Sequence, residues 1–365
     1  MIISLKDNKR IALFIPSLIV GGVERVMLNL ARGFVEREIK VDLVVANAEG
    51  PFLSHVPNEV RVINLEARRV LKSLPGLVRY LRQEQPISLL SSLDHANVVA
   101  LLAKKIAKVP TRVVVSVHTH SGMSKNLKEK LMPYWIRPFY PSATAIVAVS
   151  QGLAEDRIRL ARLPTEKVKV IYNPVVTPEL YTRAEEPINH PWFTPGEPPV
   201  ILGVGSLKSV KDFPLLIRAF ALVRKHRPAR LMILGEGEER KKLESLIYEL
   251  DLQKDVSLPG YIENPYKYMK YSRVFVLSSK WEGLPTVLIE AMALGTPVIS
   301  TDCPSGPNEI LENGKWGTLV PVGDVDALAK AIMKAIDEER GRGIERAKVF
   351  ELNNIVDRYA EILFT

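Results

Sequence analysis

The stretch Trp281-Glu282-Gly283-Leu284-Pro285-Thr286-Val287-Leu288-Ile289-Glu290 decides the fold class of this chain. Two carboxylates flank a Gly-Leu-Pro turn, and the second lies in an apolar run that continues to Gly295. Pro285 suits the first turn of a helix, where no N–H is needed, and Gly295 suits the position just past its end. The pattern therefore predicts a loop that leads into a helix, with Glu290 about two turns from its start.

Buried strands are predicted on both sides of this helix. Arg273–Ser279 precedes it and Thr296–Thr301 follows it, and both are short apolar runs. Helices alternating with such strands form a parallel, doubly wound sheet, which binds ligands at the carboxyl ends of its strands. The helix start would offer free N–H groups and a positive dipole end to a diphosphate. With Glu282 and Glu290 accepting from hydroxyls on either side, the predicted ligand is a nucleotide sugar. The alternative is a turn glutamate and a solvated helix glutamate, as most glutamates are.

Two strand–helix series are expected, with a proline-rich segment between them. Seven prolines between Pro174 and Pro199 predict a semi-extended linker over residues 176–199. The first domain is expected to cover residues 1–175 and the second residues 200–348. The expected strands of the first domain are Arg10–Ile15, Lys40–Ala46, Val60–Leu65, Ser88–Ser91, Arg112–His118, Ala145–Ser150 and Val168–Tyr172. Those of the second are Val200–Val204, Arg230–Leu234, Val256–Leu258, Val274–Ser278, Pro297–Ser300 and Gly317–Pro321.

The composition is that of a globular protein with an uneven charge. The chain has 365 residues, 25% of them charged, and a net charge of +9. Residues 1–175 carry 26 Lys and Arg against 14 Asp and Glu, whereas the remainder carries 24 against 27. The first half is therefore expected to meet an anionic partner, unless its charge serves solubility alone. The single cysteine, Cys303, excludes an intramolecular disulfide and favours a reducing compartment.

Membrane contact at the surface is a further expectation. Ile11–Val20 is too interrupted for a signal peptide and is better explained as a first strand, and no apolar run approaches the roughly 18 residues that span a bilayer. Ser124–Tyr140 combines lysines with clustered aromatics, and Glu66–Gln85 is basic and amphipathic. Both suit an anionic membrane interface. The alternative is packing helices with solvated charges.

Four further motifs surround the two glutamates along the chain. They are Ile15–Arg25 with its Gly21-Gly22 pair, Val204–Phe213 with Gly205 and Lys211, Leu234–Arg240 with Gly237, and Ser305–Glu309. Together with the spacing of Glu282 and Glu290, they resemble the retaining glycosyltransferases of family 4. The resemblance implies the GT-B fold, two Rossmann-like domains facing each other across a cleft, and a last helix, here 349–365, that crosses back onto the first domain.

The resemblance also implies site residues. His118, Lys211 and Glu282 are the expected catalytic residues. The expected donor-binding residues are Gly21, Gly22, Gly205, Ser206, Lys211, Gly237, Tyr261, Ile262, Glu282, Gly283, Leu284, Pro285, Thr286 and Glu290. Lys211 would neutralise a diphosphate leaving group. The family usually pairs this lysine with an arginine, but Ser206 stands at that position, and Lys208 is a nearby candidate for the second cation. Glu309 is expected either to order the sugar end of the site or to begin a helix.

No metal or cofactor is expected. His118 and His120 form a His-x-His pair without an evident third ligand. Asp324-Val325-Asp326 precedes an apolar helical run and is interpreted as a helix cap. The nucleotide-diphosphate sugar would be a co-substrate, and Lys211 with helix dipoles would replace a cation.

The predicted function is therefore a retaining, metal-independent hexosyltransferase. It would move a hexose or N-acetylhexosamine, from a UDP-sugar by preference, to a lipid-linked or growing surface-glycan acceptor in polysaccharide or lipopolysaccharide synthesis. We expect it in the cytoplasm, peripheral on the inner face of the membrane. A nucleotide-sugar epimerase or hydrolase on the same fold is the alternative, and product analysis would separate the two, because only a transferase needs an acceptor. A nucleic-acid-binding module would bind in a salt-sensitive way, but no recognition motif supports it.

Overall fold

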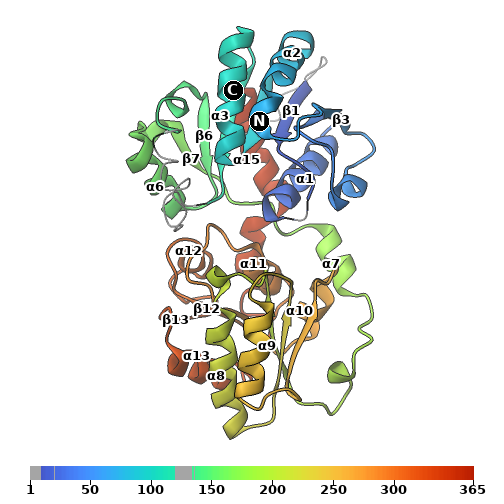
Figure 1. The fold of residues 1–365 in the computed structure, drawn as a ribbon, viewed down its shortest axis with the longest axis vertical. Helices are drawn as coiled ribbons and strands as arrows, with labels where there is room; N and C mark the ends of the chain where they lie inside the picture. Colours follow the sequence, from blue (N-terminus) through green and yellow to red (C-terminus); the bar gives the residue numbers. More distant parts are fainter. Residues whose placement is uncertain (1–9, 20, 120–133, 135) are drawn as a thin grey trace. The chain divides into compact units, whose positions relative to one another are not determined.

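The computed structural model describes residues 10–19, 21–119, 134 and 136–365, which form two compact units (Figure 1). Unit 1 comprises the residues before Val175 together with Leu352–Thr365, and unit 2 is Val175–Glu351. Each unit is built on its own sheet, and every strand pair in both sheets is parallel. Two doubly wound parallel sheets confirm the predicted GT-B fold class. Among the described residues, no helix combines the length and apolarity that crossing a bilayer requires.

Unit 1 has a seven-stranded sheet of order β3-β2-β1-β4-β5-β6-β7. Its strands are β1 (Arg10–Ile15), β2 (Lys40–Val45), β3 (Arg61–Asn64), β4 (Ser88–Ser92), β5 (Arg112–Val117), β6 (Ala145–Ala148) and β7 (Val168–Val170). The α-helices described there are α1 (Gly22–Val35), α2 (Leu74–Glu84), α3 (Asp94–Ala107), α6 (Gln151–Ala161) and α15 (Leu352–Phe364). Each strand is within a few residues of its predicted range, because apolar runs of this length between turns are strong strand signals.

Helix α15 packs on α1, so the end of the chain completes unit 1 (Figure 1). A Cβ on Gly33 would lie 2.5 Å from the Val356 side chain, which shows how closely the two helices approach. Arg37 adds a hydrogen bond of 2.9 Å to Asp357. The predicted final helix is therefore part of unit 1, and it begins at Leu352.

Unit 2 has a six-stranded sheet of order β10-β9-β8-β11-β12-β13. Its strands are β8 (Val200–Val204), β9 (Arg230–Leu234), β10 (Val256–Gly260), β11 (Val274–Leu277), β12 (Val298–Thr301) and β13 (Thr318–Val320). Its α-helices are α7 (Pro178–Ala184), α8 (Phe213–His226), α9 (Arg240–Glu249), α10 (Tyr266–Tyr271), α11 (Thr286–Ala293), α12 (Pro307–Leu311), α13 (Val325–Ala335) and α14 (Ile344–Ala347). The order reverses between β8 and β11, and α/β sheets bind ligands at such a switch point.

The proline-rich segment, predicted to be a semi-extended linker over residues 176–199, begins with a helix, α7. Thr177 caps α7 by accepting a hydrogen bond from the Leu180 N–H, and Pro178 occupies the first turn. α7 packs on α10, where Lys270 and Glu185 pair at 2.5 Å. Helix α7 forms here because its first turn is capped, and its packing on α10 makes it part of unit 2.

The ends of two unit 2 helices follow the predicted signals. α11 begins after Pro285 and ends at Leu294, and Gly295 adopts φ +73°, a conformation that favours glycine. Asp324 caps α13, because its Oδ1 accepts a hydrogen bond of 2.8 Å from the Ala327 N–H. The Asp-x-Asp motif is therefore confirmed as a helix start.

Candidate functional site

The loops that follow the strands of unit 2 meet at the carboxyl edge of its sheet. Leu207 N–H donates to Glu236 O at 2.8 Å, and Gly235 N–H donates to Gly260 O at 2.8 Å. The loop after β11 joins them, because Lys280 N–H donates to Val210 O at 2.8 Å. Main-chain bonds thus hold these loops in one layer above the strands.

Lys211 and Glu282 form an ion pair in this layer. Lys211 Nζ lies 2.6 Å from Glu282 Oε1, and their side chains are 19% and 12% exposed. Ser279 Oγ donates to the same oxygen at 2.6 Å, and Ser278 Oγ donates to Lys211 O at 2.8 Å. The two loops therefore hold a partly buried cation and carboxylate against each other before any ligand binds. The sequence predicted Lys211 and Glu282, but not the two serines that support them.

Helix α11 starts four residues after Glu282. Thr286 is its first residue, and no side chain caps its start. Its first N–H groups therefore lack a side-chain partner, as an anion site requires. Glu290 lies in the same helix and is 2% exposed. The interpretation of Glu290 as a solvated helix residue is thus wrong, and a buried glutamate is uncommon enough to favour a functional role.

Glycines set how closely the loops approach one another. Gly205 adopts φ +159°, and the Lys211 side chain crosses over it, with Cε 3.3 Å from where a Cβ would lie. A Cβ on Gly237 would lie 2.5 Å from Leu207 O, so no side chain fits there. The absence of a side chain at Gly205 thus leaves room for the Lys211 side chain, and Gly237 allows the loops after β8 and β9 to pack closely.

Ser206 stands at the position where the resemblance would place an arginine, so this position supplies no second positive charge. Ser206 and Lys208 are both exposed. Lys280 lies in the same layer, and its Nζ is 3.5 Å from the carboxylate of Asp212, the residue after Lys211. The sequence analysis overlooked Lys280, although its place directly before Trp281-Glu282 was a usable signal.

The turn after β10 carries Tyr261 and Ile262 at the same edge. Tyr261 is 51% exposed, and Ile262 is half-buried. Behind this turn, Asn264 is buried and donates a hydrogen bond of 2.8 Å to Arg183 O in α7. The segment that composition suggested was a linker therefore braces the turn that carries Tyr261.

The turn of residues 283–285 rests on the loop after β12. Ser305 Oγ donates to Gly283 O at 3.2 Å, and a Cβ on Gly306 would lie 2.6 Å from Pro285 Cδ. Leu284 is buried, and Thr286 is half-buried at the helix start. Glu309 lies in the first turn of α12, and its carbonyl accepts a hydrogen bond from Arg346 at 2.9 Å.

Cys303 lies beside this site and is buried. Its thiol is 2% exposed, and burial together with the nearby Glu282 carboxylate raises its pKa to about 12. A thiol with such a pKa is protonated at neutral pH and is a poor nucleophile.

In unit 1, Gly21 and Gly22 stand at the start of α1. A Cβ on Gly21 would lie 2.2 Å from the Glu24 carboxylate, whereas a Cβ on Gly22 would meet nothing within 4 Å. Glu24 is 7% exposed, and burial raises the pKa of its carboxyl. The sequence analysis overlooked Glu24, which lies two residues after Gly22 and whose side chain folds back over Gly21.

His118 follows β5 at the carboxyl edge of the unit 1 sheet. It is 9% exposed, and burial lowers its pKa to about 4, so the ring is neutral at pH 7. Its Nε2 lies 3.0 Å from Ser116 Oγ. A neutral imidazole suits hydrogen bonding to a sugar or a main-chain group.

Other predicted features of the first domain are only partly described. His120 and Ser124–Pro133 lie outside the described residues, and so does Trp135. Within the described part of the chain, no three His, Cys, Asp or Glu side chains come together as metal ligands would. The basic residues of Glu66–Gln85 do reach solvent, because Arg68, Arg69 and Lys72 are exposed and Leu71 is 68% exposed between them.

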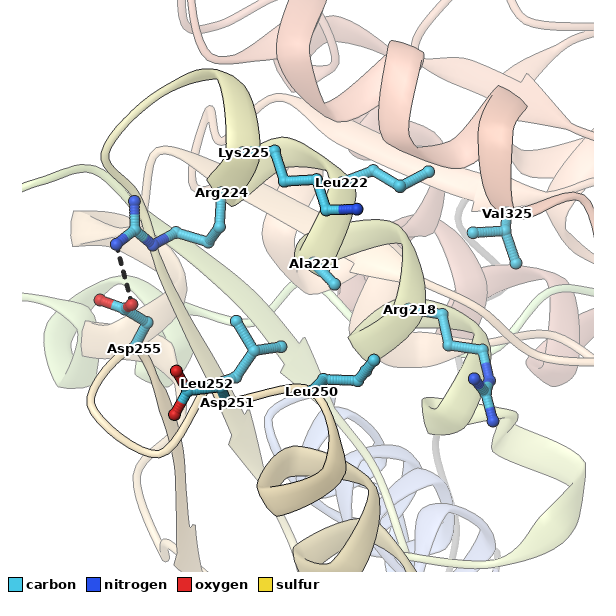
Figure 2. Close-up of a pocket in the computed structure, with 10 residues that line it drawn as sticks. All are labelled: Arg218, Ala221, Leu222, Arg224, Lys225, Leu250, Asp251, Leu252, Asp255 and Val325. Atoms are coloured by element: carbon cyan, nitrogen blue, oxygen red, sulfur yellow. Dashed lines mark hydrogen bonds and ion pairs between the residues drawn. The ribbon is translucent and has the colours of Figure 1, made fainter.

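A hollow elsewhere on unit 2 contains none of the predicted site residues (Figure 2). Arg218 and Lys225 of α8 border it, and Leu250 and Leu252 form part of its apolar lining. Figure 2 shows Arg224 turned toward Asp255, with which it pairs at 2.9 Å. Residues 250–255 precede β10, so the hollow reaches the amino edge of the sheet, away from Lys211 and Glu282.

Comparison with known proteins agrees with this geometry. The family model "Glycosyl transferases group 1" matches residues 185–354, and "Glycosyltransferase Family 4" matches residues 20–178. An uncharacterised glycosyltransferase of Methanocaldococcus jannaschii is 30% identical, over 80% of this chain and 82% of the relative.

Two further proteins extend the comparison. A Campylobacter jejuni N-acetylgalactosamine-N,N'-diacetylbacillosaminyl-diphospho-undecaprenol 4-alpha-N-acetylgalactosaminyltransferase is 29% identical, over 94% of this chain and 96% of its own. Anabaena HepE in complex with UDP shares the fold with a TM-score of 0.81 and 22% identity, over 98% of this chain and 99% of that one. The relatives with assigned activities are transferases, so the epimerase or hydrolase alternative is not favoured.

Proposed function

This chain belongs to the family-4 glycosyltransferases of the GT-B fold, and on that premise we propose a donor, an acceptor and a mechanism for it. It transfers a hexose or N-acetylhexosamine from a UDP-sugar to a lipid-linked or surface-glycan acceptor, with retention of configuration and without a metal ion. The observation that carries the proposal is the Lys211–Glu282 pair, 2.6 Å apart beside the uncapped start of α11, with Glu290 buried in that helix.

Unit 2 binds the donor. Lys211 and the first N–H groups of α11 contact the diphosphate, because both present positive charge at one edge of the sheet. Glu282 and Glu290 accept hydrogen bonds from hydroxyls on either side of the diphosphate. Gly205 leaves room for the Lys211 side chain to cross toward Glu282, and Gly237 lets the loops after β8 and β9 pack closely.

The transfer step needs no protein nucleophile. The acceptor hydroxyl oxygen bonds to the anomeric carbon as the bond from that carbon to the diphosphate oxygen breaks. The departing diphosphate takes the hydroxyl proton, so charge and atoms balance. Lys211 and α11 stabilise the negative charge that develops on the diphosphate, which is the main catalytic contribution.

A uridine donor and an isoprenoid-linked acceptor draw support from similar proteins. Anabaena HepE has been crystallised with UDP, and the Campylobacter relative is named for an acceptor on diphospho-undecaprenol. A Rhizobium meliloti relative, 26% identical, is named for lipopolysaccharide core biosynthesis. A diphosphate-linked acceptor also suits the basic charge of residues 1–175.

The membrane is the place where such an acceptor resides. Arg68, Arg69 and Lys72 surround the exposed Leu71 in unit 1, an arrangement that suits anionic headgroups and a shallow apolar contact. We therefore place the protein on the cytoplasmic face of the membrane, as a peripheral enzyme.

The experiment that tests the function is product analysis with purified protein. UDP-, GDP- and ADP-sugars are each incubated with a polyprenyl-diphosphate saccharide, with and without EDTA, and the product linkage is read by NMR. We expect a new α-linked sugar from a UDP-sugar donor at an unchanged rate in EDTA. A β-linkage would contradict retention, loss of activity in EDTA would contradict metal independence, and nucleotide release without a glycosylated product would contradict transfer.

A further inference from the structure

A buried polar network surrounds the start of α3 in unit 1. Arg157 of α6 has no exposed surface, and its Nη2 lies 2.9 Å from Asp94 Oδ2. The same nitrogen donates to Thr119 O at 2.7 Å. Tyr140, also fully buried, donates its hydroxyl to Asp94 Oδ1 at 2.5 Å. One carboxylate therefore gathers an arginine and a tyrosine from two other segments of the chain.

A second branch of the network reaches His118. Asn97 Nδ2 donates to Tyr140 Oη at 3.0 Å and to Ser116 O at 2.9 Å. Ser116 Oγ in turn lies 3.0 Å from His118 Nε2. His118 is thus held from both sides, through Ser116 before it in the chain and through the carbonyl of Thr119 after it.

Stability alone is a weak reason for such a network. Burial of a charged pair removes both ions from water, and replacement by apolar side chains is often neutral or stabilising. The bonds here end on Ser116, two residues before His118, and on Thr119, directly after it. Groups that act in catalysis need neighbours that lock them in place, and this network supplies them to one histidine.

We propose that Asp94, Tyr140 and Arg157 are positioning residues that hold the His118 ring and the adjoining main chain in the geometry that glycosyl transfer requires. This inference rests on the proposed function, in which His118 contacts the sugar being transferred. None of the three touches the reacting atoms; they act through Asn97, Ser116 and Thr119.

Unit 1 contains a matched control for this proposal. Asp42 is also fully buried, pairs with Arg61 at 2.6 Å, and accepts a hydrogen bond of 2.8 Å from the buried Tyr80. It lies in the first half of β2, in register with Ala12 of β1 and with Arg61, the first residue of β3, toward the amino edge of the sheet. Tyr80→Phe therefore removes the same hydroxyl from the same kind of pair, but far along the strands from His118.

The test compares Tyr140→Phe with Tyr80→Phe in the full-length chain. We expect Tyr140→Phe to lower kcat at least about tenfold with a nearly unchanged donor KM, and Tyr80→Phe to leave kcat within about twofold. Both should lower the melting temperature. In ¹⁵N-histidine NMR spectra, assigned with His118→Gln, the His118 ring signals should move in Tyr140→Phe and stay in place in Tyr80→Phe.

Two results would overturn the inference: full kcat in Tyr140→Phe, or equal losses of kcat in both variants that follow their losses of stability. Arg157→Lys is a second probe, because lysine keeps the charge but its shorter side chain ends closer to the main chain than the Arg157 Nη2 that donates to both Asp94 and Thr119. Its His118 signals should also move, and unmoved signals would count against the network. If the wild-type protein transfers no sugar, the proposed function fails, while the NMR comparison still decides whether the network positions His118.

Discussion

Replacement of Lys211 by methionine removes one charge and nearly no volume from the centre of the proposed donor site. Lys211 is 19% exposed and 2.6 Å from Glu282, so its charge acts in a partly desolvated layer. One well-placed donor to a developing anion contributes about 2.7–4 kcal/mol, or about 10²–10³ in kcat. The stability cost is smaller, because Glu282 keeps the hydrogen bond from Ser279. A lost hydrogen bond to a charged group costs about 1.5–3 kcal/mol, which lowers Tm by a few degrees.

Lys242→Met is the matched control for this variant. Lys242 Nζ also lies 2.6 Å from a carboxylate, that of Glu239, but the lysine is 74% exposed. Such a surface pair contributes at most about 1 kcal/mol and should not affect turnover. Steady-state release of UDP from a UDP-sugar, with acceptor present, measures both variants against the wild type. The reasoning is refuted if Lys211→Met keeps more than about a third of wild-type kcat, or if Lys242→Met loses as much.

Three further predictions concern stability and reactivity. Gly237→Ala should lower Tm by several degrees, because the new Cβ would lie 2.5 Å from Leu207 O. Gly22→Ala is the control and should leave Tm unchanged, because a Cβ there meets nothing within 4 Å. Equal melting curves for the two variants would contradict this prediction. Burial alone would raise the pKa of Asp42, but hydrogen bonds from Arg61, Tyr80 and Arg10 outweigh burial and lower that pKa. The ionised Asp42 therefore stabilises the fold above about pH 4, and this stabilisation is lost as the pH falls further. Asp42→Asn should therefore lower the unfolding free energy in urea by about 3 kcal/mol at pH 7, and an undiminished difference at pH 3 would oppose this. Cys303, with a pKa of about 12, should resist iodoacetamide in the native protein at pH 8 and react in denaturant; rapid native alkylation would show that it is accessible.

The strands of unit 2 and the loops that carry its proposed site residues were predictable because short-range signals determine them. Pro285 and Gly295 mark the ends of α11, and apolar runs mark β11 and β12. Once strands alternate with helices, the carboxyl ends of the strands must share an edge, which brings the loops of Lys211 and Glu282 together. The helix in the proline-rich segment was not predicted, because the composition of the whole segment suggested a linker. The local signal was the cap at Thr177, which begins α7.

The supporting contacts were not predictable, because they join residues that are far apart in sequence. Asp94 meets Arg157 across 63 positions and Tyr140 across 46, and no periodicity links them. The burial of Glu290 likewise depends on how α11 packs, and a glutamate in an apolar run is compatible with either outcome. Glu24 and Lys280 could have been found from the sequence, because Glu24 lies within the motif Ile15–Arg25 and Lys280 directly precedes Trp281-Glu282.

A crystal structure of the protein soaked with UDP-GlcNAc and UDP-Gal measures the central claim most directly. The account predicts diphosphate oxygens within hydrogen-bonding distance of Lys211 Nζ and of the first N–H groups of α11, and sugar hydroxyls on Glu282. A nucleotide bound elsewhere, with the Lys211–Glu282 pair unchanged at 2.6 Å, would contradict it.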